Sequence, residues 1–76
     1  MQVKLLAFAQ AREQIGFSER EILCEPTETP RAVLARIVPT FSANTCRVAV
    51  DGEYHDWNEA IGGASEIALL PPVSGG

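Results

Sequence analysis

The strongest constraint on the fold is the position of two apolar segments near the two ends of a 76-residue chain. Residues 3–8 read Val-Lys-Leu-Leu-Ala-Phe, and residues 66–70 read Glu-Ile-Ala-Leu-Leu. Both are apolar almost throughout, a pattern typical of interior strands that are covered on both faces. We therefore expect the first and last strands to lie side by side in the middle of one sheet. They would run parallel, joined by a right-handed crossover.

The crossover is predicted to contain the main helix. Thr29 is a suitable N-cap, and Pro30 fits the first helical position, where its missing N–H group is not needed. Apolar residues then recur at helical spacing and form one face: they are Val33, Leu34, Ile37, Val38 and Phe41. Pro39 disfavours helical backbone at the preceding residue, so we expect about three turns ending near Val38.

The remaining segments predict shorter elements. They are a short helix at 9–15 that stops at Gly16, a strand at 18–24, a polar loop at 42–45, a strand at 46–50, an Asp51-Gly52 turn, a return strand at 53–55, and irregular backbone at 57–63 with a Gly62-Gly63 turn. One helix must then cover one face of a mixed sheet of four or five strands. This is an α+β fold in the β-grasp arrangement of ubiquitin-like domains.

Composition excludes several classes of protein. A chain of this length holds one domain, and its net charge of −4 without a cluster of Lys or Arg argues against nucleic acid as a partner. The longest apolar runs are too short to cross a membrane, and the N-terminal residues lack the layout of a signal peptide. We expect a cytoplasmic protein.

The potential metal ligands do not form a motif. Cys24 and Cys46 are 22 positions apart, and the chain contains a single histidine, His55. We interpret the cysteines as reduced, half-buried thiols and predict no metal site and no bound cofactor.

The C-terminal residues differ in character from the domain predicted for residues 1–70. They form a tail, Pro71-Pro72-Val73-Ser74-Gly75-Gly76. Prolines favour stiff, extended backbone, and glycines lack a Cβ, so such a tail fits a channel too narrow for other residues. Its last five residues reach roughly 15–18 Å when extended. We predict that the functional group is the α-carboxyl of Gly76.

Three segments resemble the small subunit of molybdopterin synthase, the MoaD family of ubiquitin-like sulfur carriers. They are Val-Lys-Leu-Leu-Ala-Phe-Ala-Gln-Ala-Arg-Glu at 3–13, Val-Ala-Val-Asp-Gly-Glu-Tyr at 48–54, and Glu-Ile-Ala-Leu-Leu-Pro-Pro-Val-Ser-Gly-Gly at 66–76. The chain departs from the family pattern at Ala64-Ser65-Glu66, where Gly-Asp-Glu is usual, and at Asp51, where Asn is usual.

The resemblance implies a carrier cycle. An adenylating enzyme activates Gly76 with ATP, a persulfide donor converts it to a thiocarboxylate, and the tail enters the large synthase subunit, which holds the catalytic side chains. It also implies a heterotetramer of two small and two large subunits. Arg12 matches a family arginine near the partner contact.

Alternatives remain open at this stage. Phe8 and Leu70 suit an ordinary core, or Phe8, Tyr54 and Leu70 contribute to an exposed docking patch. The same tail suits a ubiquitin-like protein modifier, a sulfur carrier for thiamin or tRNA thiolation, or an interaction domain with an inert end.

Overall fold

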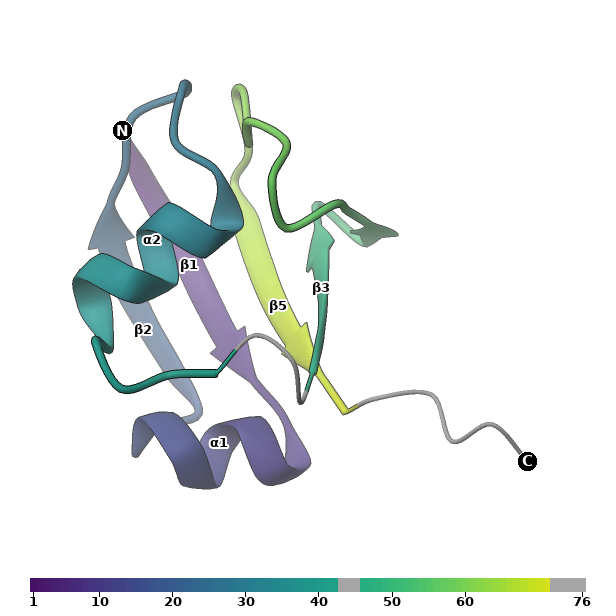
Figure 1. Cartoon of the computed structure of the whole chain (residues 1–76). Helices are drawn as coiled ribbons and strands as arrows, with labels where there is room; N and C mark the ends of the chain where they lie inside the picture. Colours follow the sequence, from purple (N-terminus) through teal and green to yellow (C-terminus); the bar gives the residue numbers. More distant parts are fainter. Residues whose placement is uncertain (43–45, 72–76) are drawn as a thin grey trace.

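A five-stranded mixed sheet, in the order β2-β1-β5-β3-β4, forms the scaffold in the computed structural model, which describes residues 1–42 and 46–71 (Figure 1). The elements are β1 (Gln2–Ala7), α1 (Ala9–Ile15), β2 (Glu19–Leu23), α2 (Pro30–Ile37), β3 (Arg47–Val50), β4 (Glu53–Tyr54) and β5 (Glu66–Leu70). The predicted α+β class, with one main helix, one short helix and a mixed sheet, is confirmed.

The first and last strands are paired at the centre of the sheet, as predicted. β1 and β5 run parallel, in a register from Lys4 opposite Glu66 to Ala7 opposite Leu69. Antiparallel β2 flanks β1, and antiparallel β3 flanks β5. A parallel pair needs a long crossover connection, and the segment containing α2 provides it.

The prediction that both faces of the central strands are covered was wrong for β1. Val3, Leu5 and Ala7 are buried, whereas Gln2 and Lys4, the two residues on either side of Val3, are exposed. The reason is that α2 lies across one face of the sheet only (Figure 1). The opposite face, which we call the open face, has no second layer among the described residues.

Helix α2 begins as the sequence indicates. The Thr29 Oγ1 atom accepts a hydrogen bond from the Ala32 N–H at 3.1 Å, and Pro30 occupies the first turn. The helix has eight residues, closer to two turns than to the predicted three. It ends at Ile37 with Val38 as its C-cap, so the stop predicted before Pro39 is confirmed. Phe41 lies beyond it and packs against Trp57, with ring centroids 5.9 Å apart.

Helix α1 lies across the end of the sheet where β1 finishes (Figure 1). Its Ala11 is buried in the core. Gly16 ends the helix in left-handed backbone, at φ 84°, and donates its N–H to the Arg12 carbonyl at 2.9 Å. A glycine adopts this conformation without steric strain, which explains the stop predicted at this position. Neither this helix nor any other in the described residues has the length and apolarity needed to span a membrane.

The hairpin between β3 and β4 is tied to the start of β5 by Asp51. Asp51 and Gly52 both have left-handed backbone, at φ 50° and 85°, as a tight two-residue hairpin turn requires. The Asp51 carboxylate accepts hydrogen bonds from the N–H groups of Ser65, at 2.9 Å, and Glu66, at 3.0 Å. The two departures from the family pattern therefore meet in one hydrogen-bonded corner.

This corner predicts an order of stability for two substitutions. Asp51→Asn keeps an acceptor oxygen and tolerates left-handed backbone, whereas Asp51→Gly relieves any strain but removes the acceptor. We expect the glycine variant to be about 1–2 kcal/mol less stable than the asparagine variant, measured by urea unfolding, because two strand-end N–H groups lose their partner. A glycine variant as stable as the asparagine variant would contradict this role.

Candidate docking surface and carrier tail

A row of small and apolar residues crosses the open face. Residues paired across a sheet share a face, and the register links Leu6 to Ala68, Ala68 to Ala49, and Ala49 to Tyr54. The row therefore runs from β1 through β5 and β3 to β4. Leu5 and Ile67, each one residue before a member of the row, are fully buried in the core that also holds Val33 and Leu34 of α2. The row must therefore face the other way.

Phe8 and Leu70 extend this surface at the end of the central strands. Phe8 has extended backbone and donates its N–H to the Leu69 carbonyl at 3.1 Å, so it continues the strand by one position. It follows Leu6 by two residues, as Leu70 follows Ala68, so both belong to the open face. Phe8 is 47% exposed and Leu70 is partly exposed, so neither is an ordinary core residue.

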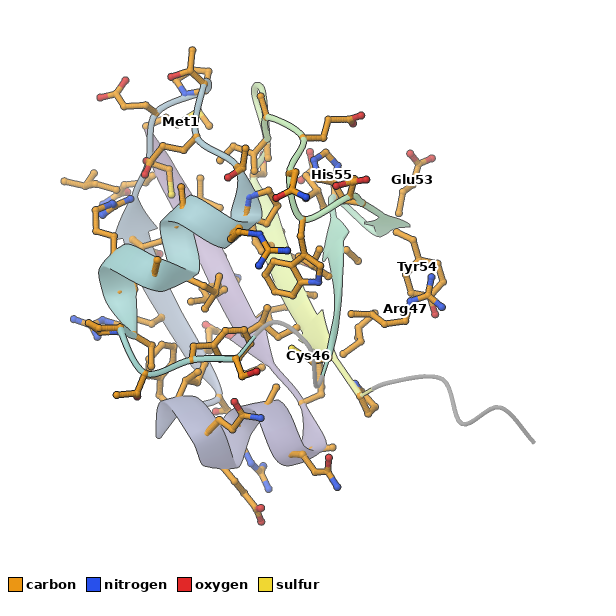
Figure 2. The ribbon with its side chains drawn as sticks, viewed as in Figure 1. Met1, Cys46, Arg47, Glu53, Tyr54 and His55 are labelled. Carbon is orange, nitrogen blue, oxygen red and sulfur yellow. The ribbon has the colours of Figure 1, made fainter. Side chains whose placement is uncertain are left out.

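Tyr54 forms the other side of the surface. It is 63% exposed, and the Arg47 guanidinium lies over its ring, 4.3 Å from the centroid. Figure 2 shows the two side chains together at the β3–β4 edge of the sheet. Arg47 is paired with Leu70, so it shares their face. The structure thus places Phe8, Tyr54 and Leu70 on one exposed face.

The place predicted for Arg12 near a partner contact stays a prediction, and the structure adds a second arginine, Arg47. Arg12 lies exposed on α1, an element separate from the strands that form the face. Arg47 was not singled out from the sequence. Alternation along residues 46–50 places it with Ala49, but only the pairing with β4 brings it onto Tyr54.

The tail begins at this surface. Pro71 is exposed and directly follows Leu70 at the end of β5. The predicted extended tail beyond it, Pro72 to Gly76, lies outside the described residues, as do residues 43–45 of the predicted polar loop.

The two cysteines are free and buried, not half-buried as predicted. Burial raises the pKa of the Cys46 thiol to about 11. Burial and the Glu28 carboxylate raise the pKa of the Cys24 thiol more than Arg36 lowers it. His55 has its Nε2 atom 2.9 Å from the Glu59 carbonyl oxygen. Within residues 1–42 and 46–71, no three His, Cys, Asp or Glu side chains converge as metal ligands.

The ThiS family model matches residues 5–76, nearly the whole chain. The chain belongs to the ThiS family.

Relatives along the whole chain carry the molybdopterin synthase name, in agreement with the resemblance. This ThiS-family chain is 34% identical over 83 residues to the molybdopterin synthase sulfur carrier subunit of Chlamydomonas reinhardtii, with 100% of each chain covered. It is 36% identical over 86 residues to the protein of that name from Mycosarcoma maydis, covering 97% of this chain and 92% of the relative.

Solved structures support the same fold. The crystal structure of SAMP1 from Haloferax volcanii matches with a TM-score of 0.72 and 25% identity, covering all of both chains. A complex of subunits 1 and 2 of molybdopterin-converting factor from Helicobacter pylori matches with a TM-score of 0.66 and 26% identity, again covering all of both chains.

The shifted thiol pKa leads to a labelling prediction. In a Cys24→Ser variant at pH 8, the thiolate of Cys46 should be roughly 100-fold scarcer in the folded protein than in the unfolded chain, because its pKa rises from 9.0 to about 11. Alkylation by iodoacetamide, followed by intact mass, should be correspondingly slow until urea is added. Equal rates with and without urea would contradict the burial.

The same pKa shift makes the stability of the folded state depend on pH. The folded state holds the Cys46 proton more tightly than the unfolded chain, so the stability this provides is fully present below pH 9. It is lost as the pH rises towards 11.

Proposed function

We propose that this protein is the sulfur carrier subunit of a molybdopterin synthase. The single observation that carries the proposal is full-length similarity to curated sulfur carrier subunits of that enzyme. The placement of Phe8, Tyr54 and Leu70 on one exposed face next to the start of the tail supports it. The reactive group in this proposal is the α-carboxyl of Gly76, and the domain is the handle that presents it.

The carrier chemistry follows from the weakness of a carboxylate as an acyl donor. With a pKa of about 3.5, a free α-carboxyl is ionised at neutral pH. In the proposed cycle a Gly76 carboxylate oxygen attacks the α-phosphorus of ATP, and pyrophosphate leaves. A persulfide sulfur then attacks the acyl carbon and AMP leaves. Reduction of the remaining S–S bond by a thiol frees the thiocarboxylate.

The thiocarboxylate is the sulfur donor in the proposal. Like a thiolate, it is an anion at neutral pH and a good nucleophile. It attacks the pterin precursor inside the large subunit, which supplies the catalytic side chains. Gly75 and Gly76 allow entry through a narrow channel, and Pro71, Pro72, Val73 and Ser74 form the stiff spacer.

The partners in the proposal are the large synthase subunit and an adenylating enzyme. The Helicobacter pylori structure is a complex of two molybdopterin-converting factor subunits, which supports a large-subunit partner. We propose that Phe8, Tyr54 and Leu70 dock on that subunit, that Arg12 lies near the contact, and that two copies of each subunit assemble in the cytoplasm.

A second candidate is a ubiquitin-like protein modifier. The 25% identity to SAMP1 of Haloferax volcanii over the whole chain favours it. A second matching structure from Haloferax volcanii is named small archaeal modifier protein 1. Both functions begin with adenylation of Gly76, so the fate of the activated end separates them. Branched conjugates to lysines of other proteins would favour the modifier.

The carrier proposal predicts a mass change. Protein co-expressed with its activating enzyme should gain the mass difference between one sulfur and one oxygen at Gly76, measured by intact-mass and C-terminal peptide analysis. Deleting Gly76, or adding a residue after it, should abolish this change and molybdopterin formation while leaving the circular dichroism spectrum unchanged. A deleted variant that still supports molybdopterin formation would overturn the proposal.

The docking role predicts a matched pair of results. Leu70→Asp should weaken binding to the large subunit by about 30-fold or more, because it places a charge in an apolar contact. Leu23 is also exposed and on the open face, but it lies on β2 at the edge away from β3 and β4. Leu23→Asp should therefore bind within about twofold of the wild type in calorimetry. Equal effects of the two substitutions would exclude a contact centred on Leu70.

A further inference from the structure

Arg47 occupies a distinctive place on the open face. It is exposed, it is paired across the sheet with Leu70, and its guanidinium lies over the ring of Tyr54. In the described part of the chain its guanidinium has no ion-pair partner; the Arg36–Glu28 and His55–Glu59 pairs lie elsewhere. A cation therefore lies between two of the apolar residues assigned to docking, with its hydrogen-bond donors unused by described side chains.

Stacking on Tyr54 prepares this guanidinium for a planar ligand. A guanidinium placed over the face of an aromatic ring keeps the N–H groups that point away from the ring available as donors. Those groups match the two oxygens of a carboxylate in a bidentate pair. Because the ring limits the side chain to few rotamers, less conformational entropy is lost when such a pair forms.

The charges on the rest of the open face differ from those around Arg47. Glu21 and Glu66 are paired with Lys4 on the two strands beside it, and Glu19 lies opposite Leu6. The side of the face towards β2 therefore has excess negative charge. At the β3–β4 edge the face presents Arg47 instead, so the part of a partner that covers Leu70 and Tyr54 meets positive charge, to which a negative group is complementary.

We propose that Arg47 is a specificity-determining residue of the docking surface, and that it binds a carboxylate side chain of the large subunit beside Leu70. This inference rests on the proposed function. A partner that covered Leu70 and Tyr54 without offering a carboxylate would bury an unpaired guanidinium, which is strongly unfavourable. Arg47 thus selects among large subunits as well as stabilising the correct one.

The test compares Arg47 with a matched arginine. Arg20 also lies near an aromatic ring, 5.6 Å from the centroid of Phe17, but it is paired with buried Leu5 and so is not on the open face. Binding of the full chain to the molybdopterin synthase large subunit of the same genome is measured by calorimetry at low and high salt. The variants are Arg47→Gln, Arg47→Glu, Arg20→Gln and Arg20→Glu.

We expect Arg47→Gln to weaken binding about 10-fold and Arg47→Glu about 100-fold, with the wild-type salt dependence reduced in the glutamine variant. The Arg20 variants should stay within about threefold of the wild type, since they change net charge equally but lie off the face. Arg47→Lys keeps the charge without the planar fork and should fall between wild type and Arg47→Gln. All variants should keep the wild-type circular dichroism spectrum because both arginines are exposed.

Two outcomes would overturn the inference. One is an Arg47→Glu variant that binds as tightly as the wild type while Leu70→Asp fails to bind; the docking surface would then stand without a role for Arg47. The other is an equal loss for Arg47→Glu and Arg20→Glu, which would reduce the effect to net charge. If Leu70→Asp also bound normally, the docking surface of the proposed function itself would be wrong.

Discussion

The parallel pairing of β1 with β5 is the interaction on which the rest of the structure depends. It joins residues that are more than 60 positions apart in the chain, so its loop-closure entropy must be offset by burial of the central side chains. Leu5, Ile67 and Leu69 in this pair are fully buried. The same register places Phe8 beside Leu70, so the pairing that forms the core also assembles the candidate docking surface.

The helical layer on one side of the sheet has a second consequence. Since α2 covers one face, each strand separates its residues into a core set and an open-face set. Ala49 on β3 and Ala68 on β5 belong to the open face but are buried, and Tyr54 and Phe8 lie on either side of them. Phe8 and Tyr54 are two of the four large hydrophobic residues that are exposed in the described part of the chain.

The two thiols are buried and the Asp51 carboxylate is hydrogen-bonded within the fold, whereas the proposed reactive group is the carboxyl of Gly76. The thiols of Cys24 and Cys46 are buried, and their pKa values are raised. The Asp51 carboxylate is committed to two backbone N–H groups. In a sulfur carrier, this division would keep the domain inert towards the persulfides and thiols that it meets, and would confine reactivity to Gly76.

The sequence by itself determined the elements whose causes are local. Neighbouring residues explain the Thr29 cap, the helix ends at Gly16 and before Pro39, and the turn at Asp51-Gly52. The two apolar end segments correctly predicted the central pair of strands. The tail motif and its implied chemistry also came from sequence, and they remain predictions. Only the tertiary structure decided that one face of β1 is open and that Arg47 lies on Tyr54. Burial and cross-strand contacts depend on which strands become neighbours, and that register is set by the whole core rather than by any single segment.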